Sequence, residues 1–208
     1  MKKNNTSLYL AAIFAVALLI GVGYAALSAT LKINGQTTIS KASWDVHFES
    51  ITTNDSSTIK LYAPSDTNLS SPLSSITSTN ATTLNYRVNL TGPDASAATT
   101  HNVTAKVVNN GTIDATVSTV SLPTAASVTS TNTSAVTAIS KMMTIKCTYD
   151  DGTEIKTGDV IKAGASKNIV CKHHYKAASE LTQSDLNVWN NITSATGNLS
   201  LTLNFTAK

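Results

Sequence analysis

The feature of this chain that most restricts its fold is a two-residue alternation of apolar and polar side chains. The alternation recurs in residues 44–49, 84–90 and 199–205, where every second residue is large and apolar. Successive side chains of a β-strand point to opposite faces, so this period buries one face of a sheet and leaves the other in water. Abundant Thr, Val and Ile also favour strands over helices. We therefore expect an all-β protein.

The other elements follow from shorter patterns and from turn residues. Further strands are expected at residues 59–63, 103–108, 113–120, 142–149 and 167–175. Tight hairpin turns are expected at Asn34-Gly35, Asn110-Gly111 and Asp151-Gly152, because Asn and Gly tolerate positive φ. The Ser- and Thr-rich segments 65–83 and 124–140 predict surface loops, and residues 184–189 predict one or two helical turns. Together these elements predict an antiparallel two-sheet β-sandwich of the jelly-roll-like or immunoglobulin-like kind.

The first 25 residues predict a hydrophobic signal helix ahead of this domain. Lys2 and Lys3 precede an apolar run over residues 8–20, and small residues follow it up to Ala26. A basic start, an apolar centre and a small-residue exit are typical of a secretory signal peptide. We expect cleavage after Ala25 or Ala26, which leaves residues 26–208 as a single β-sandwich domain, secreted and extracellular or at the cell surface. The alternative is a retained anchor, because about 20 residues are just enough to span a bilayer.

Composition and charge exclude several classes of function. Charged residues make up 13% of the 208 residues, against a usual value of about 25%. The net charge of +3 is scattered along the chain, so no nucleic-acid partner is expected. The sequence has neither an HExxH zinc motif nor a GxSxG nucleophile motif. We therefore expect no enzymatic activity and no cofactor.

The two cysteines are the main candidates for side-chain chemistry. Cys147 and Cys171 each share a predicted strand face with apolar residues. An even number of cysteines in an exported chain favours a disulfide between them. One alternative is two separate buried thiols. Another is a zinc site that adds His173, although a fourth ligand is missing.

The remaining polar candidates have simpler explanations. The carboxylates in residues 150–159 are expected to lie in a solvated turn, with weak calcium binding as the alternative. His47 and His174 alternate with apolar neighbours and are expected to face solvent, whereas His101 is expected in a polar loop.

Several segments resemble a known protein family. Residues 21–48 read GVGYAALSATLKINGQTTISKASWDVHF, residues 110–114 read NGTID, and residues 150–169 read DDGTEIKTGDVIKAGASKNI. These segments resemble the TasA/camelysin-like family of exported bacterial fibre proteins, which carry a SipW-type signal peptide. The chain departs from the family pattern at its Pro-Gly-Asp turn, where the nearest text is Gly92-Pro93-Asp94.

The resemblance implies a jelly-roll subunit that polymerises with copies of itself outside the cell. It also implies that the mature N-terminal segment is a donor strand, which leaves its own subunit and completes a sheet in the next. The apolar side chains of that strand would be Leu27, Ala29, Leu31 and Ile33. Head-to-tail contact of this kind does not close on itself and gives filaments. The expected partners are further copies of the chain and, during export, a signal peptidase, with membrane contact only through the signal segment before cleavage.

Two other interpretations of the mature chain stay open at this point. One is that residues 27–39 form an ordinary hairpin within their own domain. The other is a monomeric secreted adhesin or carbohydrate-binding module, which needs an exposed aromatic cluster. Trp44 is expected on a buried face, so Trp189 is the one aromatic candidate outside a clear strand. A secreted metallopeptidase would need metal ligands that the sequence does not present.

Overall fold

The computed structural model describes residues 42–208, except for residues 67, 78, 80 and 93–97. Four predictions lie outside the described residues: the signal segment, its cleavage at Ala25 or Ala26, the donor strand over residues 27–33 and the hairpin turn at Asn34-Gly35. They stay predictions. Within the described part of the chain, no helix is both long enough and apolar enough to cross a membrane.

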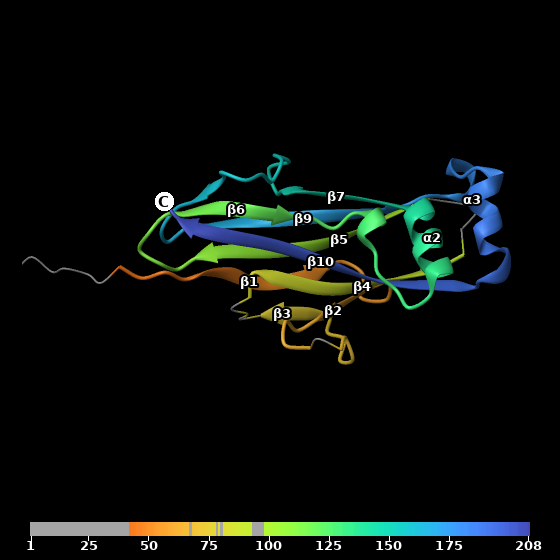
Figure 1. Ribbon diagram of the computed structural model, residues 1–208, viewed down its shortest axis with the longest axis horizontal. Coiled ribbons are helices and arrows are strands. Elements are labelled where there is room, and N and C mark those ends of the chain that lie inside the picture. Colours follow the sequence, from red (N-terminus) through yellow and green to blue (C-terminus); the bar gives the residue numbers. More distant parts are fainter. Residues whose placement is uncertain (1–41, 67, 78, 80, 93–97) are drawn as a thin grey trace, which may run out of the picture. The chain divides into compact units, whose positions relative to one another are not determined.

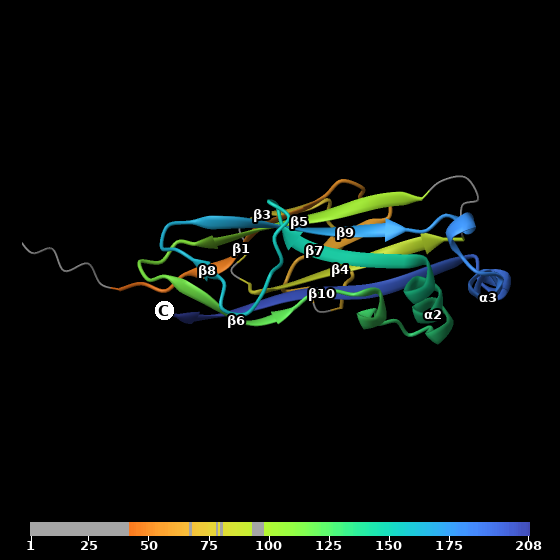
Figure 2. The same ribbon diagram turned by 90° about the horizontal axis from the view of Figure 1, so that it is seen from above.

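The described residues form two antiparallel sheets of five strands each, packed face to face (Figure 1, Figure 2). Sheet A has the order β3 (Ser75–Thr77), β1 (Val46–Thr53), β5 (Thr99–Asn109), β9 (Ser166–Tyr175) and β7 (Met143–Tyr149). Sheet B has the order β2 (Ile59–Tyr62), β4 (Thr83–Thr91), β10 (Ser194–Ala207), β6 (Ala115–Ser121) and β8 (Val160–Ile161). The predicted all-β, antiparallel two-sheet sandwich is confirmed.

The chain changes sheet after every described strand. Odd-numbered strands form sheet A and even-numbered strands form sheet B, so consecutive strands are never hydrogen-bonded neighbours in this part of the chain. The hairpin predicted at Asn110-Gly111 is therefore wrong. The turn predicted at Asp151-Gly152 does reverse the chain tightly, with the Gly152 N–H donating to the Tyr149 C=O and the Tyr149 N–H donating to the Thr153 C=O, but the next strand, β8, belongs to the other sheet. Both turns lie in connections that pass from sheet A to sheet B. Asn and Gly permit a sharp reversal in an arch between sheets as well as in a hairpin, so residue type alone does not separate the two.

A buried asparagine shapes the arch between β5 and β6. The Asn109 amide donates to the carbonyl oxygens of Ile113 and Ile161, at 2.9 and 3.0 Å, and its Oδ1 accepts from the backbone N–H of Gly111. A Cβ at position 111 would lie 2.6 Å from the Ser43 carbonyl oxygen. Glycine is therefore required for this close approach, and Asn109 ties β5 to the chain around β6 and β8.

The predicted alternation correctly places most of the core. In β4, every second residue from Leu84 to Leu90 is buried, and β10 follows the same pattern from Leu199 to Leu203. These side chains meet the inward face of sheet A, where Phe48, Val107 and Ile169 are among the fully buried residues.

Strand β1 departs from the predicted alternation. Its pairing with β5 shifts register between Phe48 and Ser50, as a β-bulge does by inserting one extra residue. Trp44, expected on a buried face, precedes β1 and is 46% exposed. His47, expected to face solvent, is buried, with its Nδ1 2.7 Å from the Asp45 carboxylate. Both predictions are wrong. The register shift is not the cause, because it follows Phe48, and Val46 and Phe48 are buried as the alternation predicts: Trp44 lies outside the strand, and His47 is buried together with both neighbours.

Helical segments occupy a stretch that was expected to be a loop. The 3-10 turn η1 (Ala125–Ser127) and helix α2 (Thr133–Met142) fall in residues 124–142, so the loop prediction for 124–140 is wrong. The Asn132 side chain caps α2 by accepting from the backbone N–H groups of its first turn. The buried face of α2 consists of Ala135, Ala138, Ile139 and Met142. Small alanines among many Ser and Thr residues conceal this helical spacing in the sequence.

The remaining helical turns agree with the sequence. After β9 the chain forms η2 (Ala178–Glu180), α3 (Gln183–Asn187) and η3 (Val188–Asn191). The one or two helical turns predicted for residues 184–189 are thus confirmed. In Figure 1, α2 and α3 lie at the same end of the sandwich.

Gly197 of β10 allows the helical segments to approach sheet B. A Cβ at this position would collide with Val128 Cγ1 and lie 2.7 Å from Ile139 Cδ1. We expect Gly197→Ala to lower the free energy of unfolding by about 1–3 kcal/mol, as overpacking of a core does, measured by urea unfolding. Gly92→Ala is the control, because among the described residues its Cβ would meet only Trp189 Cε3, at 3.9 Å. Equal losses in the two variants would contradict the packing explanation.

Candidate functional site

Two predicted site residues meet in sheet A. Cys147 of β7 and Cys171 of β9 are direct register partners with Cα atoms 4.0 Å apart, and their sulfurs form a disulfide. Both residues are buried. The predicted disulfide is confirmed. It excludes the two alternatives of separate thiols and of a zinc site with His173, because a disulfide offers no thiolate ligand.

Loss of this disulfide should destabilise the fold. The bridged cysteines are 24 residues apart, and the chain-entropy model gives about 3 kcal/mol for a loop of this length. We expect the double variant Cys147→Ala/Cys171→Ala to lose about this much free energy of unfolding in urea. A thiol assay on the denatured parent protein should find free thiols only after reduction, and thiols detected before reduction would contradict the bridge.

Strand β7 is an edge strand with backbone groups that point outward. Antiparallel partners alternate between hydrogen-bonded and non-hydrogen-bonded pairs, and the second kind has the shorter Cα separation. The 4.0 Å separation assigns Cys147 to the second kind, so the N–H and C=O of Cys147 and of Ile145 point away from β9. The backbone of Tyr149, two residues further along, has the same orientation. Its C=O accepts from the Gly152 N–H and its N–H donates to the Thr153 C=O, both on the side away from β9. Ile145 and Cys147 have no comparable backbone partner among the described residues.

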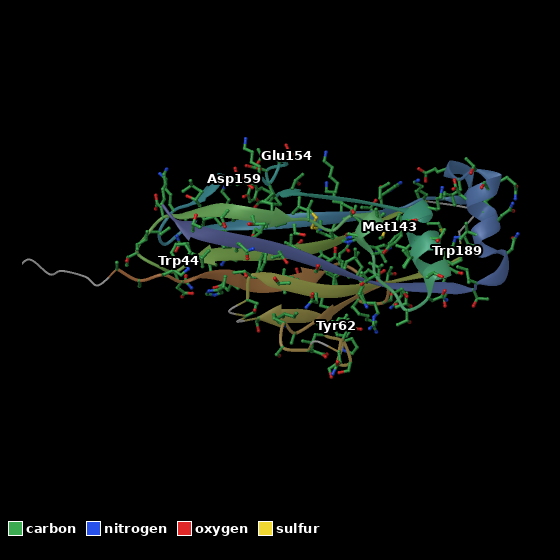
Figure 3. The ribbon with its side chains drawn as sticks, viewed as in Figure 1. Trp44, Tyr62, Met143, Glu154, Asp159 and Trp189 are labelled. Atoms are coloured by element: carbon green, nitrogen blue, oxygen red, sulfur yellow. A yellow bond between two sulfur atoms is a disulfide. The ribbon has the colours of Figure 1, made fainter. Side chains whose placement is uncertain are left out.

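An apolar groove lies beside this edge. Its volume is about 410 Å³. Ile145 lies on the core face of β7 but is only partly buried, so it offers apolar surface to the groove. Glu154, labelled in Figure 3, contributes a carboxylate to the lining. The lining residues used in the argument below are Leu122, Pro123, Ile145, Lys146, Cys147 and Glu154.

The groove is open because sheet B supplies little edge at this position. Strand β8 pairs only with Ala115 and Thr116, and backbone bonds from residues 158 and 159 extend the contact to Val117. The rest of β6, residues 118–121, has no strand partner on its outer side within the described residues. Sheet A therefore ends in a complete edge strand, β7. Sheet B ends in the short strand β8, which covers only part of β6.

This arrangement suits the addition of an extended peptide strand. An added strand would pair with the outward N–H and C=O groups of β7 and place alternate side chains in the apolar groove. Exposed edge strands are ready templates for such pairing. The groove was not predicted from the sequence, because an edge and an interior strand can carry the same alternation.

Two carboxylates of the acidic turn beside the groove, those of Asp151 and Asp159, accept hydrogen bonds from nearby residues. Asp151 accepts hydrogen bonds from the Thr153 hydroxyl and backbone N–H, and these lower the pKa of Asp151 below its usual value. Asp159 accepts from the Lys156 backbone N–H and from the Tyr149 hydroxyl. No group of three potential metal-binding side chains is found within the described residues.

His173 is a buried histidine between the two sheets. Its Nε2 lies 2.8 Å from the Tyr86 hydroxyl of β4 in a hydrogen bond that crosses the core. Burial lowers the pKa of His173 to about 4, so the imidazole is neutral at neutral pH.

His101 and His174 are less buried than His47 and His173. His101 belongs to β5 rather than to a polar loop, so that prediction is wrong, and its Nδ1 lies 3.1 Å from an Asp55 carboxylate oxygen. The side chain of His174 is 39% exposed, as its alternation with apolar neighbours predicted.

Acid should destabilise the protein through His173. The unfolded histidine binds a proton near pH 6.5 but the folded one only near pH 4, so stability is lost as the pH falls through this window. At about 1.4 kcal/mol per pH unit, the loss approaches ~3 kcal/mol. His173→Gln should flatten this part of the stability curve, measured by urea unfolding at pH 7, 5.5 and 4. His174→Gln, at an exposed site, should leave the slope unchanged; an unchanged slope in His173→Gln would refute the assignment.

We compared the chain with known protein families, curated proteins and solved structures. No protein-family model, curated protein or solved structure matches this chain.

Proposed function

We propose that the mature chain is an exported structural subunit of extracellular fibres, and that subunits assemble by exchange of their N-terminal strand. The single observation that supports this most strongly is the groove beside β7. It combines outward backbone groups at Ile145 and Cys147 with an apolar lining. This is the chemistry that receives a β-strand.

The predicted donor strand is complementary to this groove. Leu27, Ala29, Leu31 and Ile33 share one face of that strand, and alternate residues of a strand are about 6.6 Å apart. Two successive members of the series would therefore reach the apolar lining while the backbone pairs with β7. Lys32 is the charged residue of the segment, and the groove lining carries one charge of each sign, Glu154 and Lys146, so the complementarity is apolar rather than electrostatic.

Strand exchange of this kind produces filaments rather than closed oligomers. The donor segment and the acceptor groove are different surfaces, so each subunit offers one and receives the other. The disulfide fixes β7 to β9 and keeps the acceptor edge in register while the incoming strand pairs with it.

A charge in the groove should prevent assembly. We expect mature protein, residues 26–208, to form filaments visible by negative-stain microscopy and Ile145→Lys to form few or none, because the ammonium group would be buried among apolar groups. Thr144→Lys is the matched control, since Thr144 is exposed on the opposite face of β7. A deletion of residues 27–40 should abolish filaments in the same way.

Urea unfolding of each variant separates loss of assembly from loss of folding. Filaments formed equally by all variants would contradict strand exchange while sparing the fibre function. A parent protein that stays monomeric by light scattering across concentration and time would contradict the fibre function itself.

The alternative is a monomeric secreted adhesin or carbohydrate-binding module. Trp44, 46% exposed, favours it, because an exposed indole can stack on a ligand. Trp189, the sequence-based candidate, is only 8% exposed, so it does not complete an exposed aromatic pair with Trp44. We propose no catalytic activity for either function.

A further inference from the structure

Trp44 is the most exposed large apolar side chain among the described residues. It is 46% exposed, and the next such side chain is Leu73, at 41%. Trp44 precedes β1 and lies in the half of the sandwich away from α2 and α3 (Figure 1, Figure 3). Single exposed apolar residues are common on soluble proteins, so a role for Trp44 needs further observations.

The first such observation is that the backbone on both sides of Trp44 is held in place. The Ser43 N–H donates to the Thr112 hydroxyl oxygen at 2.9 Å, and the Thr112 N–H donates back to the Ser43 carbonyl oxygen at 3.0 Å. On the other side, the Asp45 carbonyl oxygen accepts from the Asn110 N–H at 2.8 Å. The indole is therefore carried by a fixed backbone, although it lies only two residues from the start of the described chain.

The arch between β5 and β6 is shaped to receive this segment. A Cβ at Gly111 would lie 2.6 Å from the Ser43 carbonyl oxygen and 3.0 Å from the Asp45 backbone nitrogen. The Asn109 side chain accepts from the Gly111 N–H and holds the turn from within. A group whose backbone is ordered before binding loses less conformational entropy when a partner covers it. Tryptophan is also among the residues that most often dominate the binding energy of protein interfaces.

The position of Trp44 along the chain indicates which partner would cover it. About eleven residues lead from Ile33, the last apolar residue of the predicted donor strand, to Trp44. A chain of this length spans at most about 40 Å, at ~3.3–3.6 Å per residue. When the donor strand pairs with β7 of the next subunit, Trp44 must lie within that distance of the acceptor groove. The subunit that receives the strand is therefore within reach of the indole.

We propose that Trp44 forms a second contact between subunits, in which its indole packs on the surface of the copy that has received the donor strand. The proposal rests on the proposed fibre function and adds one residue to the same interface. The exchanged strand supplies backbone pairing at the groove, and the indole supplies apolar burial outside it. A carbohydrate is the less suitable partner, because Trp189 is only 8% exposed and adds no second ring.

Tryptophan fluorescence tests this contact directly. The chain has two tryptophans, and Trp189 is already buried, so a change of environment on assembly reports on Trp44. We expect filament formation by mature protein, residues 26–208, to shift the emission to shorter wavelength and to reduce its quenching by acrylamide. Filaments of Trp44→Phe should show neither change.

The concentration needed for assembly measures the contribution of the indole. Trp44→Ala should raise the critical concentration for filament formation about tenfold or more, as loss of an interface anchor does. Its midpoint of urea unfolding should stay that of the parent, because the side chain is exposed. Leu73→Ala is the matched control: it removes a similarly exposed apolar side chain and should leave the critical concentration unchanged.

Two variants of Thr112 test the fixed backbone. Thr112→Ala removes the acceptor of the Ser43 N–H and should raise the critical concentration, but less than Trp44→Ala does. Thr112→Ser keeps the hydroxyl and should restore the parent value. Equal behaviour of the two variants would overturn the positioning role of the arch.

The outcomes separate this contact from the fibre function. An unchanged critical concentration in Trp44→Ala, or an equal rise in Leu73→Ala, would overturn the contact and leave the fibre function standing. A parent protein that forms no filaments would overturn both. The variant without residues 27–40 serves as the monomer, and a saturable blue shift of its emission on addition of cellohexaose would assign Trp44 to a carbohydrate and overturn the contact between subunits.

Discussion

Burial of alternating apolar side chains between two sheets is the interaction on which the rest of the structure depends. Because the chain changes sheet after each described strand, consecutive strands are held together through the core and not through shared ladders. The connections must therefore bend sharply without disturbing that core. Asn109 and Gly111 accomplish this at the β5–β6 arch, and Gly197 permits the close packing of α2 on β10. In the same arrangement, the outer side of β6 in sheet B is only partly covered by β8. The groove beside β7 lies next to this uncovered part.

The polar groups inside the sandwich differ in how fully their hydrogen bonds are satisfied. Asn109 makes three hydrogen bonds to neighbouring backbone groups and serves the fold. Tyr86 and His173 form one hydrogen bond across the core, but His173 Nδ1 is buried without a partner among the described residues, and burial makes the histidine sensitive to acid. The Tyr175 hydroxyl is buried without a partner in the described part of the chain.

Much of the fold could be predicted from local pattern, and the failures have identifiable physical causes. The strands β4 and β10 and the Cys147–Cys171 bridge were predictable, because each follows from a face of a regular strand. The environments of Trp44 and His47 were not predictable from alternation, because Trp44 lies before β1 begins and His47 is buried together with its neighbours Val46 and Phe48. Helix α2 was missed because alanines make up half of its buried face. The groove beside β7 was not visible in the sequence, because it combines residues from segments far apart along the chain.

By itself, the sequence determined that this chain is β-rich, which faces of its regular strands are apolar, and that its two cysteines can pair. These properties depend on side-chain chemistry at fixed spacing along one strand. Only the tertiary structure decided which strands became neighbours, that the Asn-Gly and Asp-Gly turns lie in connections between sheets, and that β7 became an edge with an open groove. The physical reason is that a strand's alternation specifies one buried face but carries no information about which backbone hydrogen-bonds to its sides.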